Sequence, residues 1–279
     1  MILFLLDEWL KKARCFVSWR SVVLLALTVP ATAWSQSADL ISRMAANEVA
    51  ARQQRAHFAY MSEERSTRTG DRLWKEKVVE TADGPLRRLI AIDGRALTAG
   101  ETEAERRRID SLVAHPDDFR SMNRAHKDDE DQATRLLQML PKAFVLSEDG
   151  EMNGCNRIRF RPDPAFQPST YQERVAHEME GSISVKQPED RLCSLEATIM
   201  HPVEFGFGVL GRIDQGGHFS LERKEFDPAN WKTDRISVHV NGRILLLKSL
   251  AQSQEIVRTE IRVAPQNLSL VQAAQMIRE

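Results

Sequence analysis

Alternation of apolar and polar residues dominates the chain after Ala143. Segments 157–161, 182–186, 193–199 and 257–263 place apolar residues at alternate positions. A period of two means that each strand buries one side of its surface and leaves the other in water. The second half of the chain therefore predicts an antiparallel sheet with one buried and one solvated face.

The first half predicts a helix followed by shorter strands. Segment 38–54 carries apolar residues near helical spacing, and Ser37 is suited to cap its first turn. Segments 58–67, 72–81 and 86–93 are typical of strands, because they are rich in apolar residues and separated by Gly-containing turns.

A polar segment at 100–141 predicts a helical insertion between the two strand regions. We expect Pro116 to break the helix and Pro141 to end it, because proline disrupts a helix interior. The acidic run at 127–131 is predicted to be a solvated bend, with a metal site from its carboxylates as the alternative.

Dipeptides containing glycine mark the predicted turns of the second half. Asp149-Gly150, Asn153-Gly154 and Gly216-Gly217 separate strand segments. Asn241-Gly242, flanked by alternating apolar residues, is the strongest hairpin signal in the chain. The last segment, 264–277, predicts a short terminal helix.

Three glycines, Gly206, Gly208 and Gly211, match the spacing G-x-G-x-x-G of dinucleotide-binding loops. That motif requires a preceding strand and a helix that begins within it. Here Pro202 interrupts the approach, Gly216 falls where the helix should be, and the following residues alternate like a strand. We therefore expect no nucleotide, and assign the glycines to a bulge or a bend in a curved sheet.

No other motif predicts catalysis, a metal or a cofactor. His177-Glu178 resembles the start of a zinc-protease helix, but Gly181 occupies the place of the second histidine. The chain contains no G-x-S-x-G element. The formal net charge of −1 and a pI of about 6.7 lack the basic excess of nucleic-acid-binding proteins.

Residues 1–35 have the pattern of a signal peptide. Basic residues precede an apolar stretch at 22–33, and Ala33-Trp34-Ser35 is a small-x-small cleavage site. We expect export with cleavage near Ser35; an uncleaved membrane anchor is the alternative, because the chain begins with a further apolar run.

Two cysteines, Cys155 and Cys193, remain after the predicted leader. In an oxidising compartment they are expected to form a disulfide that bridges two antiparallel strands. Two separate buried thiols are the alternative.

Arg157, Arg159 and Arg161 form a basic row on one face of a predicted strand. Strand alternation alone predicts polar residues there, so a solvated surface is the simpler interpretation. Contact with anionic head groups or an acidic partner is the alternative.

Segments 70–98 and 180–244, with Trp231 after a predicted hairpin, give the chain its resemblance to a known group. Their ladder of strands, after a leader and an N-terminal helix, resembles the periplasmic outer-membrane lipoprotein carrier and sorting superfamily. The resemblance implies a periplasmic protein whose unclosed β-barrel wraps around helices and encloses a hydrophobic cavity for acyl chains.

We therefore predict an α+β fold with one domain at 36–279. A curved antiparallel sheet, an unclosed half-barrel, should have its concave face covered by helices at 38–54 and 100–140. The expected function is non-catalytic binding or transport of a lipid or an acylated lipoprotein segment. An envelope adaptor that binds a protein partner, and an enzyme whose site is hidden in the sequence, are the rival classes.

Seven large aromatic residues are candidates to line the cavity, and filling of an ordinary core is the alternative for each. They are Trp74, Phe144, Phe160, Phe205, Phe207, Phe219 and Trp231.

Overall fold

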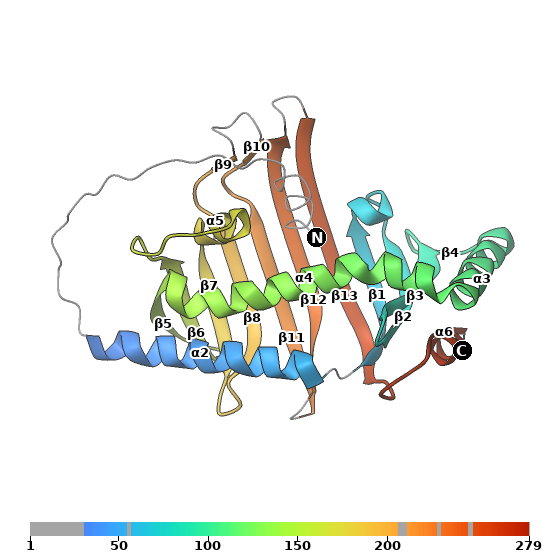
Figure 1. Ribbon diagram of the computed structural model, residues 1–279, viewed down its shortest axis with the longest axis horizontal. Helices are drawn as coiled ribbons and strands as arrows, with labels where there is room; N and C mark the ends of the chain where they lie inside the picture. Colours follow the sequence, from blue (N-terminus) through green and yellow to red (C-terminus); the bar gives the residue numbers. More distant parts are fainter. Residues whose placement is uncertain (1–30, 55–56, 206–210, 228–229, 245–247, 279) are drawn as a thin grey trace.

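A computed structural model describes residues 31–54, 57–205, 211–227, 230–244 and 248–278 (Figure 1). Within these ranges thirteen strands form one antiparallel sheet. The strands are β1 (Phe58–Ser66), β2 (Trp74–Thr81), β3 (Gly84–Ile92), β4 (Arg95–Ala96), β5 (Phe144–Met152), β6 (Cys155–Pro162), β7 (Met179–Lys186), β8 (Arg191–Ile199), β9 (Val203–Phe205), β10 (Gly211–Ile213), β11 (His218–Asp227), β12 (Asn230–Ile244) and β13 (Lys248–Val263).

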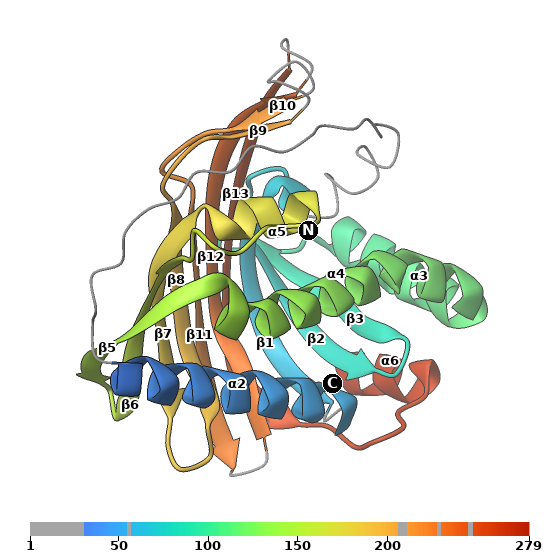
Figure 2. The same ribbon diagram turned by 60° about the vertical axis from the view of Figure 1, so that its left-hand side comes forward.

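The sheet is curved but does not close. Its strand order is β4-β3-β2-β1-β13-β12-β11-β8-β7-β6-β5, and β9 and β10 attach beside the end of β12. The helical elements are α2 (Ala31–Gln54), η1 (Thr67–Thr69), α3 (Ala99–Ala114), α4 (Pro116–Ala143), α5 (Tyr171–His177) and α6 (Leu270–Arg278). Figure 2 shows the strands curving around α2 and α4. The predicted α+β half-barrel is confirmed.

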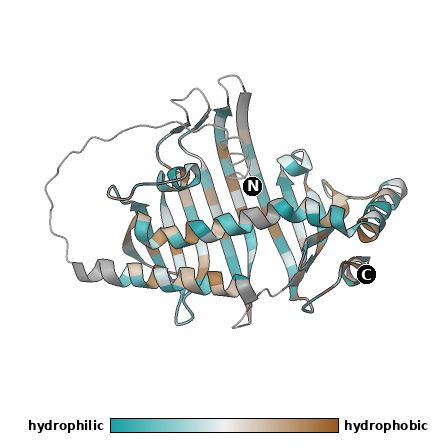
Figure 3. Ribbon diagram, in the orientation of Figure 1, coloured by the Kyte–Doolittle hydropathy of each residue, from teal (hydrophilic) through white to brown (hydrophobic). Residues whose placement is uncertain are grey.

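Helices α2 and α4 lie next to each other across the inner face of the sheet (Figures 1 and 2). Ile41 and Met44 of α2 are fully buried, and Ala143 at the end of α4 packs in the same core. That core also contains Ile158 and Ile183 from β6 and β7. Hydrophobic and hydrophilic residues alternate along the strands, as expected from the sequence (Figure 3).

The start of α2 differs from the prediction. The helix begins at Ala31 rather than near Ala38, so Ser37 lies inside it instead of capping it. The residues from Ala31 to Ala38 include neither Gly nor Pro, and nothing in their sequence stops a helix. The helix thus runs through the predicted cleavage site at Ser35.

The helical insertion is confirmed, including its break at Pro116, but the predicted stop at Pro141 and the predicted bend at 127–131 are wrong. Pro116 is the first residue of α4, a position where its missing N–H costs nothing. Pro141 does not end the helix, which continues to Ala143 because Met139 and Ala143 are anchored in the core. The backbone of 127–131 is helical rather than bent, since charged residues are tolerated on a helix surface.

Two of the predicted turns lie inside strands. Asn153-Gly154 forms the β5–β6 turn with φ of 54° and 72°, as predicted. Asp149-Gly150 instead lies within β5, at an irregularity in its pairing with β6. Asn241-Gly242 lies within β12, which runs straight on to Ile244. A Cβ atom on Gly242 would come within 2.3 Å of the Arg212 carbonyl oxygen, so this glycine permits β10 to approach β12.

The glycine-rich segment leads into a strand, not a helix. Gly211 is the first residue of β10, which pairs with β9 and β12. Gly206 and Gly208 lie outside the described residues. Gly216 has a φ of 84°, and a Cβ atom on Gly217 would lie 2.8 Å from the Ile199 side chain. The predicted turn at Gly216-Gly217 is therefore present between β10 and β11, and Gly211 begins a strand instead of leading into the helix that a dinucleotide motif requires.

Candidate functional site

A row of apolar side chains crosses the inner face of the sheet from strand to strand. Ile183, Leu195, Leu221, Ile236 and Ile256 are successive register partners on β7, β8, β11, β12 and β13. The four gaps between five neighbouring strands span about 19 Å. The two terminal members are buried, whereas the three central ones are half-buried. We call these five residues the apolar row.

The apolar row ends at a buried carboxylate on β1. Ile256 pairs with Glu64, which is 2 % exposed. The Arg68 guanidinium lies 2.6 Å from Glu64 and 2.8 Å from the carboxylate of Glu76. Burial alone would raise the pKa of Glu64, but hydrogen bonds and the charge of Arg68 hold it below its ordinary value. The row thus meets an ionised, fully paired group.

A second buried carboxylate joins α2 to the sheet. Glu48 is 3 % exposed and accepts hydrogen bonds from the Nε of Arg191 at 2.9 Å and the backbone N–H of Leu192 at 3.1 Å. Arg223 of β11 also donates to Glu48. Burial favours a raised pKa, but the positive charges of Arg223 and Arg191 keep the pKa of Glu48 lowered.

Glu48, Arg191 and Arg223 are not among the residues predicted to form a site, although the sequence carries one signal for their contact. Ile41, Met44 and Glu48 are three and four residues apart along α2, so they lie on one face of the helix. An acid on the apolar face of a helix requires a partner when that face is buried. The spacing indicates burial but does not name Arg191 or Arg223.

The predicted aromatic residues do not gather in one place. Phe144 and Phe160 contact each other edge to face, 5.1 Å apart, in the core beneath α2 and α4. Phe205 is buried in a separate cluster beside Tyr171 of α5, and half-buried Phe219 packs against that cluster.

Each of the two tryptophans packs against an arginine. Trp74 on β2 packs against Arg68, whose guanidinium lies 5.3 Å from the ring centroid. Trp231 is 8 % exposed and packs against Arg191. Phe207 lies outside the described residues. Most of these aromatic residues therefore fill core or flank an arginine, and the half-buried part of the inner face is mainly aliphatic.

The arginine row lies on the outer face of β6. Asp149 is 3.5 Å from Arg157 and 3.0 Å from Arg159, and Glu196 is 3.9 Å from Arg157. Arg161 is exposed. Nearby carboxylates neutralise part of this row, as in an ordinary solvated strand surface.

The disulfide between Cys155 and Cys193 is present, with a Cα–Cα distance of 6.7 Å. Its placement differs from the prediction. The strands β6 and β8 flank β7 and are parallel to each other, so they are not antiparallel partners. The bond crosses β7 where the pairing of β7 with β8 skips Cys193. It therefore joins the two strands that lie on either side of β7.

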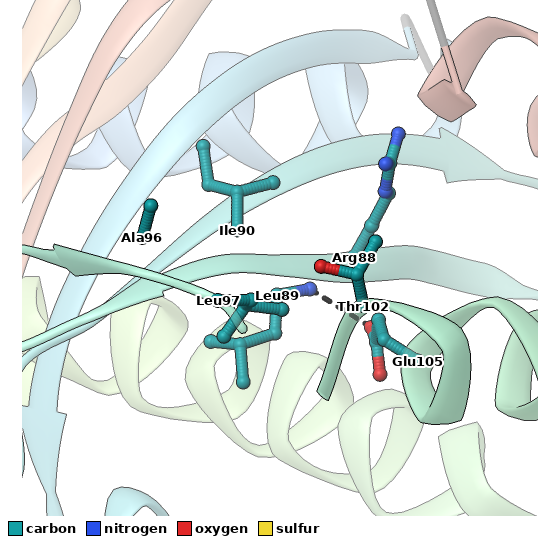
Figure 4. A pocket seen from close by; sticks show the side chains of 7 residues that line it. All are labelled: Arg88, Leu89, Ile90, Ala96, Leu97, Thr102 and Glu105. Carbon is teal, nitrogen blue, oxygen red and sulfur yellow. Dashed lines mark hydrogen bonds between the residues drawn. The ribbon is translucent and has the colours of Figure 1, made fainter. Parts of the chain in front are cut away.

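A small cleft lies at the other end of the sheet, between β3, β4 and α3 (Figure 4). The backbone N–H of Leu89 donates to Glu105 of α3 there, at 2.8 Å. The cleft has a volume of about 180 Å³, below the 300–1,000 Å³ typical of ligand pockets. Its lining residues are Arg88, Leu89, Ile90, Ala96, Leu97, Thr102 and Glu105, none of which belongs to the apolar row.

No family model, curated protein or solved structure matches the chain. Within the described ranges, no helix has the length and apolar character needed to cross a membrane. Nor do the described His, Cys, Asp and Glu side chains form a group of three or more that could hold a metal ion. The side chains of 125–129, which include part of the predicted bend at 127–131, lie outside this description.

Proposed function

We propose that the protein binds an amphiphile, a lipid or the acylated segment of a lipoprotein, on the inner face of its sheet, and that it does so in the periplasm after export. The observation that carries this proposal is the apolar row, whose centre is half-buried although it lies beneath helices. Burial of an acyl chain provides about 0.8 kcal/mol per CH₂. A chain lying along Leu195, Leu221 and Ile236 could therefore be held without any catalytic group.

The buried carboxylates favour binding over catalysis. A general acid or base that works near neutral pH requires a carboxyl pKa raised toward 7. Glu48 and Glu64 show the opposite shift, because arginines hold their pKa values low. Both groups are therefore suited to structural pairing and not to proton transfer.

Native mass spectrometry of the protein, purified gently from its own envelope, tests this function. We expect additional mass that disappears on organic extraction and is identified as lipid or acylated peptide. The extracted protein should then take up a fluorescent fatty acid. An unliganded mass together with no uptake would contradict the proposal.

An adaptor that binds an envelope protein is the second candidate, and an exposed apolar patch favours it. Phe226 is 39 % exposed and Val263 is 48 % exposed. The ring centroids of Phe226 and Phe58 lie 6.4 Å apart. Val263 is the register partner of Phe58 where β13 pairs with β1. Exposed apolar patches often mark protein contacts. The same experiment separates the candidates, because an adaptor would show no lipid mass and no uptake.

A further inference from the structure

Three arginines surround the single buried carboxylate of Glu48. Arg191 and Arg223 both donate to it, with side chains only 9 % and 13 % exposed. Arg52 follows Glu48 by one helical turn. Its guanidinium donates hydrogen bonds to the backbone carbonyl of Glu130 and to the hydroxyl of Thr134, both on α4. Three positive charges thus face one buried negative charge. Including the exposed carboxylate of Glu130, the charges of the described side chains sum to +1.

The buried charge cluster around Glu64 is balanced. Around Glu64, two carboxylates meet Arg68 and Arg87. Lys232 is paired with Glu80, and Arg258, which packs on the same Tyr60 ring as Lys232, adds a further positive charge there. Uncompensated charge away from water is costly, so folded proteins normally pair it. The excess around Glu48 therefore favours a compensating negative charge at this place.

Trp231 adds an unused hydrogen-bond donor to the same place. Its ring lies 5.7 Å from the Arg191 guanidinium, and its carbonyl oxygen accepts from Arg223 at 3.1 Å. The indole N–H is buried, and no acceptor for it is found among the described residues. Buried donors almost always have a partner. The cluster thus lacks both negative charge and hydrogen-bond acceptors, and an anion supplies both.

This arginine cluster adjoins the apolar row. Arg223 follows Leu221 by two residues on β11, so both side chains lie on the inner face, about 7 Å apart along the strand. Leu192, which follows Arg191, packs in the core beneath α2 with Leu221 at its edge. A head group held by Arg223 would therefore lie beside Leu221, within reach of a chain that ends on the apolar row.

We propose that Arg52, Arg191 and Arg223 bind the anionic head group of the amphiphile, a carboxylate or a phosphate. The inference rests on the proposed function, to which it adds the charge of the ligand. Guanidinium groups match both oxyanions, because they donate two parallel hydrogen bonds to a pair of oxygens. Arg52 is exposed, whereas the side chains of Arg191 and Arg223 are largely buried.

The electrostatics of Arg223 agree with this assignment. Burial lowers its pKa, and the charges of Arg191 and Arg52 lower it further, against the opposing effect of Glu48. A bound anion would raise the pKa of Arg223 again, because its negative charge opposes the effects of burial and of the neighbouring arginines.

The test compares three ligands of equal chain length on the delipidated protein: laurate, dodecyl phosphate and the uncharged dodecyl maltoside. Titration calorimetry should show at least one anionic ligand binding about tenfold tighter than the neutral one. Arg223→Gln and Arg52→Gln should each remove about that factor for the anionic ligand and leave the neutral ligand unchanged. The preferred anion distinguishes a carboxylate from a phosphate head group.

Arg43→Gln is the matched control, because Arg43 lies on the same helix, is 54 % exposed and pairs with Asp190 outside the cluster. It should change neither affinity. Arg52→Gln keeps the test decisive if Arg223→Gln fails to fold, since Arg52 is exposed. Equal affinity for charged and neutral ligands would overturn the head-group site and leave the proposed function standing. Binding of none of the three would overturn both.

Discussion

Arg191 and Glu48 connect the first helix to the middle of the sheet across 143 residues of sequence, with 2.9 Å between Nε and Oε1. Both side chains are less than a tenth exposed. Removal of one partner from such a pair leaves an uncompensated buried charge. The position of α2 on the sheet therefore depends on this contact as well as on its apolar face.

Replacement of Glu48 should destabilise the protein strongly. Glu48→Ala leaves Arg191 and Arg223 without their carboxylate, and we expect the free energy of unfolding to fall by about 3–5 kcal/mol. Lys75→Ala is the control, because it breaks an ion pair with Glu63 in which the two side chains are 42 % and 44 % exposed, and should cost at most about 1 kcal/mol. Urea denaturation of both variants measures the difference. Equal losses would show that burial of the pair is unimportant.

Acid should weaken the same contact. The pKa of Glu48 in the folded protein lies below its ordinary value, because the two arginines outweigh the effect of burial. The ionised carboxylate therefore contributes stability above the unfolded-state pKa of about 4.3, and this contribution is lost as the pH falls through the folded-state pKa. The gap in stability between the unaltered protein and Glu48→Gln should narrow between pH 7 and pH 3. A gap that stays constant with pH would contradict this.

Denatured but unreduced protein should show no free thiol from Cys155 or Cys193. The bond joins positions 38 residues apart in sequence. Its loss should cost about 2–4 kcal/mol, because the cross-link restricts the unfolded chain. Urea denaturation of a double Cys→Ser variant, compared with the oxidised protein, measures this. Two reactive thiols in the thiol titration would disprove the bond.

Local patterns were enough to predict most of the fold. Alternation on segments such as 182–186 and 193–199 identified strands, because burial of one face is decided within the strand itself. The wrong predictions concern residues whose conformation depends on a segment that is distant in sequence. Asn241-Gly242 has the residue types of a turn, yet Gly242 lies within β12 and permits β10 to approach that strand. No local sequence pattern reveals this contact.

The candidate site was predictable only in part. The alternation that marks Leu195 as inward-facing is visible in the sequence, but its pairing with Leu221 depends on strand order. Large aromatics were a poor guide, because their size favours core positions such as those of Phe144 and Phe205. The half-buried aliphatic residues between these cores could not be distinguished from core residues by type.

The close approach at Gly242 should make that glycine sensitive to substitution. In Gly242→Ala the new Cβ atom would lie 2.3 Å from the Arg212 carbonyl oxygen, so β10 and β12 must separate. We expect a loss of about 1–3 kcal/mol. Gly100→Ala in α3 is the control: no atom lies within 4 Å of its new Cβ, and alanine favours the helix by up to about 1 kcal/mol. Thermal unfolding of both variants should move in opposite directions, and a neutral Gly242→Ala would contradict the packing described.

Leu221 provides the sharpest test of where an acyl chain lies. In Leu221→Trp a larger side chain occupies the half-buried centre of the apolar row, and we expect the affinity for a fluorescent fatty acid to fall about tenfold, which corresponds to roughly 1.4 kcal/mol. Ser220→Trp is the control, because Ser220 is the preceding residue of the same strand and faces outward. Circular dichroism should show both variants folded. If Ser220→Trp weakens uptake as much as Leu221→Trp does, the ligand does not lie on the inner face. If neither variant changes uptake, the chain lies elsewhere than on the apolar row.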